Sequence, residues 1–76
     1  MKINWNEFKA FKHEYDNPHG RDNFALLIEF LRSFYNVQDI HLLYDSLKND
    51  DLALLMMKKR RISSVIILEK YMAKKF

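Results

Sequence analysis

Apolar residues recur at helical spacing near the start of the chain. The stripe consists of Trp5, Phe8, Phe11 and Tyr15. Their separations of three, three and four positions predict one face of an α-helix. Asn4 can cap this helix, Glu7 can complete a capping box, and Ile3 can pack against Phe8. The helix is predicted to end before Pro18, in the turn DNPHG. The polar residues away from the centre of the stripe are Lys9, Lys12 and His13.

The next apolar stripe, in residues 24–35, is wider. It consists of Phe24, Leu26, Leu27, Ile28, Phe30, Leu31, Phe34 and Tyr35. Asp22 is placed to cap this helix. At about 100° per residue the apolar arc spans about 200° and leaves a narrow polar strip of Glu29, Arg32 and Ser33. We expect such a helix to lie at the centre of the fold.

A third, shorter helix is predicted after Asn36. Its apolar face consists of Ile40, Leu43, Tyr44 and Leu47, and its outward positions are Gln38, His41, Asp45 and Lys48. The spacing i, i+3, i+4, i+7 is that of an amphipathic helix. Asn49 or Asp50 can cap the helix that follows.

The last segment, Leu52 to about Lys75, is apolar in nearly every direction around a helical axis. The β-branched residues between Ile62 and Leu68 would also suit a strand, but a single strand would leave its backbone unpaired. We therefore predict one long helix, with a bend near Arg60 as a variant. The fold class is all-α: a compact bundle of three to four helices in a single domain, residues 1–76, whose last helix is long and largely buried or at a dimer interface.

Composition agrees with a helical domain. One Gly, one Pro and 49% apolar residues disfavour disorder and a many-turned β fold. The absence of cysteine suits a reducing compartment, and neither a secretory signal nor a membrane span is apparent, so a cytoplasmic location is expected.

The apolar surface exceeds what a bundle of this size normally covers. A short bundle needs one apolar stripe per helix, whereas the second and last helices have more. Large exposed apolar patches are uncommon on monomers, so we expect a homodimer. The predicted dimer or partner interface comprises Met56, Met57, Ile62 and Ile66. A monomer whose last helix is wrapped by the others is the alternative.

Positive charge is concentrated at the end of the chain. Residues 37–51 have a net charge of −3 and residues 52–76 a net charge of +6, within a total of +3. The candidate contacts for a partner or nucleic acid are Lys58, Lys59, Arg60, Arg61, Lys74 and Lys75. These cations can bind phosphates, face an acidic protein, or be solvated over the core. A helix-turn-helix is disfavoured because its recognition face would include Asp39 and Asp45.

The sequence contains no motif typical of catalysis or of cofactor binding. HEYDNPH, residues 13–19, lacks the second histidine of a HExxH zinc site, and there is no glycine-rich phosphate loop. We expect no enzyme activity, no catalytic, cofactor or metal site, and no small-molecule substrate. The function favoured is a small regulator or adaptor that binds protein through an apolar helix face with a basic rim. The alternative is a basic nucleic-acid-binding module for transcription or replication.

Overall fold

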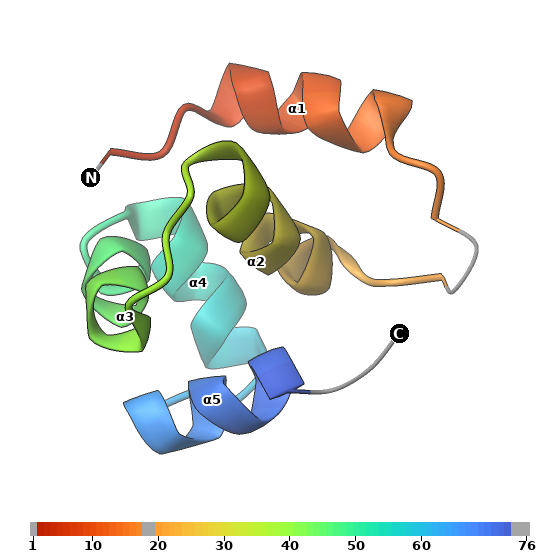
Figure 1. Ribbon diagram of the computed structural model, residues 1–76. Coiled ribbons are helices and arrows are strands. Elements are labelled where there is room, and N and C mark those ends of the chain that lie inside the picture. The colour runs from red at the N-terminus through yellow and green to blue at the C-terminus, as the bar shows by residue number, and fades with distance from the viewer. Residues whose placement is uncertain (1, 18–19, 74–76) are drawn as a thin grey trace.

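The computed structural model describes residues 2–17 and 20–73, and helix is the only regular secondary structure in them. The helices, shown in Figure 1, are α1 (Trp5–Glu14), α2 (Asn23–Phe34), α3 (Ile40–Lys48), α4 (Asp51–Lys59) and α5 (Val65–Ala73). The all-α prediction is confirmed for these residues. The predicted number of helices, three to four, is wrong, because the last predicted helix is two separate helices.

Side-chain caps set the starts of the first four helices. The capping residues are Asn4, Asp22, Asp39 and Asp50, each of which accepts backbone N–H groups from the first turn that follows. Such caps satisfy donors that have no partner within the helix. The predicted capping box is incomplete, because the backbone N–H of Asn4 donates to the Tyr35 hydroxyl, at 3.2 Å, and not to the Glu7 carboxylate.

Helix α2 lies in the middle of the fold, with α1 on one side and α3, α4 and α5 on the other (Figure 1). Its fully buried residues include Phe24, Leu27, Phe30 and Leu31. The Phe30 ring lies 5.4 Å from the Phe8 ring and 5.3 Å from the Phe11 ring, so it joins α1 to the core. The predicted central position of this helix agrees with its burial.

The chain leaves helix α4 through a left-handed turn at Arg61, whose φ is 58°. The Ile62 N–H donates to the Met57 carbonyl at 2.9 Å, and the Arg61 N–H donates to the Lys58 carbonyl at 3.1 Å. These two bonds are those of a Schellman motif, which ends a helix and reverses the chain direction. The prediction of one continuous helix is therefore corrected to a helix, a turn and a second helix.

The turn at Arg61 allows α4 and α5 to pack against the same core. Met57 in α4, Ile62 in the turn and Leu68 in α5 are all buried, and α3 packs against both α4 and α5. The Tyr44 hydroxyl of α3 donates to the Ser63 carbonyl at 2.9 Å. A straight helix would point these apolar side chains in diverging directions, so breaking it buries more of them.

Candidate functional site

An open groove of about 460 Å³ separates α1 from α4, with the start of α2 beside it. The residues that line it are Trp5, Asn6, Phe8, Lys9, Lys12, Asn23, Leu52, Leu55, Met56 and Lys59. We call this depression the α1–α4 groove. Its volume is within the usual range of ligand pockets, about 300–1,000 Å³.

The two walls of the groove have the same pattern. The α1 wall consists of Trp5, Phe8, Lys9 and Lys12, and the α4 wall consists of Leu52, Leu55, Met56 and Lys59. In both helices the positions are i, i+3, i+4 and i+7, which is one face of a helix. In both, the apolar residues come first and a lysine occupies the last position. The groove is therefore apolar along the first turn of each wall and has its lysines along the second, where Met56 also lies.

The α1 wall is held by aromatic contacts. The Trp5 and Phe8 rings meet edge to face with centroids 5.7 Å apart, and Phe8 is buried. The ammonium group of Lys12 lies 4.9 Å from the centre of the Phe8 ring, within the range of a cation–π contact. Lys9 is exposed on the same wall. Lys12 thus lies over the apolar base of the wall, with the exposed Lys9 beside it.

The α4 wall leaves large apolar side chains uncovered. Leu52 is 55% exposed and Leu55 is 51% exposed, although both lie in a regular helix. Met56 beside them is half-buried and Lys59 is exposed. Exposed single leucines are ordinary, but two leucines on one wall of a groove, opposite a tryptophan, form a contiguous apolar surface.

One hydrogen bond ties the two walls together where both helices begin. The Trp5 indole N–H donates to Oδ2 of Asp50 at 3.0 Å. The other oxygen of Asp50, Oδ1, accepts the N–H groups of Leu52 and Ala53 and so caps α4. A single carboxylate therefore starts the α4 wall and holds the Trp5 ring at the apolar end of the groove.

A second carboxylate, Asp22, holds the far end of α4. Asp22 Oδ2 lies 2.9 Å from the Arg60 guanidinium, and the Tyr71 hydroxyl donates to Asp22 Oδ1 at 3.0 Å. Oδ1 also accepts the N–H of Ala25, which caps α2. One side chain thereby links α2, the end of α4 and α5.

These contacts change two pKa values. Partial burial favours the protonated form of Asp22, but the hydrogen bonds from Ala25 and Tyr71 and the charge of Arg60 outweigh it, so the pKa of Asp22 lies below its ordinary value. Burial, followed by the hydrogen bond to Asp22, raises the pKa of Tyr71 to about 12. At neutral pH the contact therefore joins a carboxylate to a neutral phenol.

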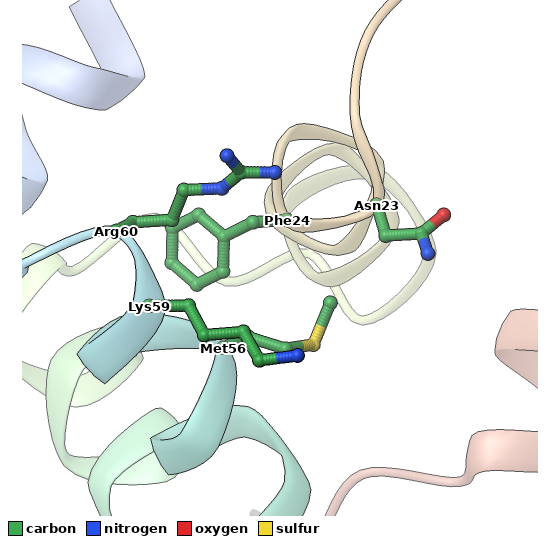
Figure 2. A pocket seen from close by; sticks show the side chains of 5 residues that line it. All are labelled: Asn23, Phe24, Met56, Lys59 and Arg60. Atoms are coloured by element: carbon green, nitrogen blue, oxygen red, sulfur yellow. The ribbon is translucent and has the colours of Figure 1, made fainter.

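A smaller depression of about 220 Å³ adjoins the groove at its basic end. It is lined by Asn23, Phe24, Met56, Lys59 and Arg60, of which Asn23, Met56 and Lys59 also line the larger groove. Figure 2 shows Lys59 and Arg60 extending on either side of the Phe24 ring. No Asp or Glu lines either depression among the described residues. The electrostatic character of the combined surface is therefore positive.

The four adjacent cations that the sequence indicated as contacts have different surroundings in the fold. Lys59 lines the groove, whereas Arg60 pairs with Asp22. Lys58 and Arg61 are exposed outside the groove lining. Lys74 and Lys75 lie outside the described residues. Only Lys59 of the described set belongs to the groove.

The four residues predicted at a dimer or partner interface are also separated by the fold. Met57 is 1% exposed and Ile62 is 5% exposed, so the core of the same chain covers them. The prediction that Met57 and Ile62 lie at an interface is therefore corrected, because both side chains are buried in the core of their own chain. Met56 lines the groove. Ile66 is 69% exposed on α5, outside the groove lining.

Most of the groove was not predicted from the sequence. The lining residues that were missed are Trp5, Asn6, Phe8, Lys9, Lys12, Asn23, Leu52 and Leu55. The shared spacing of the two walls is visible in the sequence, but such spacing ordinarily marks a core-facing stripe. The sequence predicted that Lys9 and Lys12 lie away from the centre of the apolar face of α1. In the structure both residues line the groove.

The described residues contain no group of three or more His, Asp or Glu side chains placed to bind a metal ion. None of the described helices is both long and apolar enough to cross a membrane. Comparison with models of protein families, with curated proteins and with solved structures gave no match for this chain. The interpretation of the groove therefore depends on its own shape, composition and charge.

Proposed function

We propose that this chain is a small, non-enzymatic regulator or adaptor that binds an acidic region of another protein in the α1–α4 groove. The observation that carries the proposal is the uncovered pair Leu52 and Leu55, which faces Trp5 across a groove lined by three lysines and no carboxylate. An apolar centre with a polar, solvent-accessible rim is the usual anatomy of a protein-binding surface.

Affinity and selectivity would come from different parts of the groove. Covering Trp5, Leu55 and their neighbours removes apolar surface from water, and a few such anchors usually supply most of the binding free energy. The lysines, at the solvent-exposed rim, would mainly speed encounter with an acidic partner and set its orientation. Both effects require a partner that combines apolar side chains with carboxylates.

Affinity capture from the source lysate, after nuclease treatment, tests the proposal with a matched pair of variants. Leu55→Glu places a carboxylate in the groove, whereas Ile66→Glu places one on α5, outside it. A partner retained by the wild type and by Ile66→Glu, but lost by Leu55→Glu, would support the groove. Equal retention by both variants, or no retained protein, would overturn the proposal.

Nucleic acid binding is a second candidate function, favoured by the exposure of Lys58, Lys59 and Arg61 around the end of α4. Each phosphate neutralised by a cation makes binding more dependent on salt. Titration with random duplex DNA between 50 and 200 mM salt tests this candidate. A steep loss of affinity over that range would favour it, and no binding at the lower concentration would eliminate it.

The homodimer also remains a prediction. Apart from the groove leucines, the exposed large apolar residues in the described part of the chain are Phe34, Leu42, Ile66 and Ile67. A second copy covering Met56 and Ile66 would reduce this exposed surface. Light scattering at micromolar protein concentration tests it directly, since a particle of 9.3 kDa would be the single chain. A dimer that persists in Leu55→Glu would place its interface outside the groove.

A further inference from the structure

We infer that the partner segment bound in the α1–α4 groove is an amphipathic α-helix with carboxylates on both sides of its apolar stripe. The inference rests on the proposed protein-binding function and specifies the occupant. It follows from three properties of the groove: the helical backbone of its walls, the length of their matched stripes, and the distribution of charge over them.

The walls offer no backbone partners to an extended peptide. Residues 5–12 belong to α1 and residues 52–59 to α4, so most of their N–H and C=O groups are bonded along their own helices or to the caps. An extended segment pressed against this surface would bury backbone groups without partners. A helix satisfies its own backbone, and helix-in-groove binding uses apolar anchors at i, i+3, i+4 and i+7.

The matched stripes set the length of the contact. Each wall spans seven residue steps, or about 10.5 Å at 1.5 Å per residue, which is two helical turns. A groove of about 460 Å³ accepts side chains and not an entire helix. The bound helix therefore lies on the groove and inserts apolar side chains from two successive turns between Trp5 and Leu55.

Charge determines the position of the acidic residues on the bound helix. Lys9 and Lys12 stand on the α1 wall and Lys59 on the α4 wall, so cations flank the groove on both sides. Carboxylates on both edges of the apolar stripe would meet these cations. At the other end Asp50 and the exposed Asp51 would repel a carboxylate. The acidic residues of the bound helix are therefore expected over the second turn of the walls, at one end of the contact.

Selection of peptides from a random library tests the inference without a known partner. The immobilised wild-type chain is used for selection, and Leu55→Glu is used to remove binders that do not need the groove. Peptides of about 16 residues are long enough to form a helix on binding. We expect the enriched sequences to place apolar residues at i, i+3, i+4 and i+7 with Asp or Glu beside them, and to become helical on binding, as measured by circular dichroism.

The lysines provide a second test. Replacing Lys9, Lys12 and Lys59 together by Gln is expected to weaken binding of an enriched peptide about tenfold at low salt, and much less at high salt. The matched control replaces Lys58, Arg61 and Lys70 by Gln. These residues lie outside the groove lining, so the affinity for the peptide is expected to stay unchanged.

The outcomes separate the inference from the function on which it rests. Enriched peptides that depend on the groove but are basic, uncharged or extended would overturn the inference and leave protein binding in place. The absence of any groove-dependent peptide would also overturn it, and the lysate capture would then decide the proposed function on its own.

Discussion

Helices α2 and α4 both carry more apolar residues than a single stripe, but the fold covers them to different extents. Helix α2 buries Phe24, Ala25, Leu26, Leu27, Ile28, Phe30 and Leu31. Helix α4 buries only Ala53 and Met57, and leaves Leu52 and Leu55 about half exposed. The same chain thus uses excess apolar surface in two ways: that of α2 forms the core, and that of α4 lines a groove.

This difference predicts that stability depends on α2 and binding depends on α4. A buried aromatic residue contributes through the contacts that it makes in the folded state, whereas a half-exposed leucine gains little from folding. Changes along α2 should therefore lower the free energy of unfolding, and changes on the groove face of α4 should not. Four substitutions test this contrast, from the largest expected effect to the smallest.

Phe30→Ala should have the largest effect. Phe30 is fully buried and contacts the rings of both Phe8 and Phe11, so its loss leaves a cavity at the junction of α1 and α2. The expected decrease is about 3–5 kcal/mol in the free energy of unfolding, measured by urea denaturation. The control is Phe34→Ala, because Phe34 is largely exposed. Phe34 also belongs to α2, so equal losses in the two variants would contradict the dependence of stability on burial along this helix.

Arg61→Gly tests the turn that ends α4. Arg61 has a φ of 58°, a conformation that costs an L-residue about 1–2 kcal/mol and that glycine adopts freely. After the entropy cost of glycine, a stabilisation of up to about 1 kcal/mol is expected. A continuous helix through this position would instead lose about 1 kcal/mol. The sign of the change in unfolding free energy therefore distinguishes the two structures.

Asp22→Asn tests the contact that joins α2 to the end of α4. Asn retains the cap, but the charge that faces Arg60 is lost. Because the pKa of Asp22 is lowered in the folded state, its stabilisation is present above the ordinary carboxyl pKa and is lost as pH falls through the native value. At neutral pH the variant should be less stable by under about 1 kcal/mol.

The Asp22 prediction is checked by urea denaturation of both proteins across the acidic range. The difference between wild type and Asp22→Asn should shrink as pH falls through the lowered native pKa of Asp22, since its carboxyl group is then protonated and both side chains are uncharged. A difference that stays constant over this range would show that the Asp22 charge does not contribute.

Leu55→Glu should have the smallest effect on stability. Leu55 is half exposed on the groove side of α4, and surface substitutions of this kind change the unfolding free energy by about 0.5 kcal/mol or less. The comparison variant is Met57→Glu, which places a charge in the core, about 200° around α4 from Leu55. A large loss in Leu55→Glu would mean that the groove face of α4 is needed for folding.

Local signals in the sequence predicted much of the fold. Asn4, Asp22 and Asp50 are capping residues whose side chains act on the next few N–H groups, so the starts of α1, α2 and α4 could be located without tertiary contacts. The break after α4 was not predicted, because arginine has no preference for the left-handed conformation that Arg61 adopts. Ser64, whose hydroxyl accepts from Ile67 at 3.5 Å, was the available cap signal for α5.

The groove could not be located from the sequence for a different reason. Its walls begin at Trp5 and Leu52, far apart in the chain, and the local pattern of a helix does not say which helix lies beside it. The hydrogen bond between Trp5 and Asp50 places the two walls together, and it joins residues 45 positions apart. The sequence placed the basic contacts on residues 58–61 and on Lys74 and Lys75, and of the described members of this set Lys59 lines the groove.

Trp5 is the only tryptophan of the chain and lines the groove, so its fluorescence reports directly on occupancy. The most direct measurement is a titration of the wild-type chain with an acidic, amphipathic, tryptophan-free peptide obtained by the selection. Burial of the Trp5 ring beneath the peptide should shift its emission to shorter wavelength, saturably, and the shift should be absent in Leu55→Glu. Emission that stays unchanged while the peptide binds, or that shifts equally in Leu55→Glu, would contradict the assignment of the α1–α4 groove as the binding site.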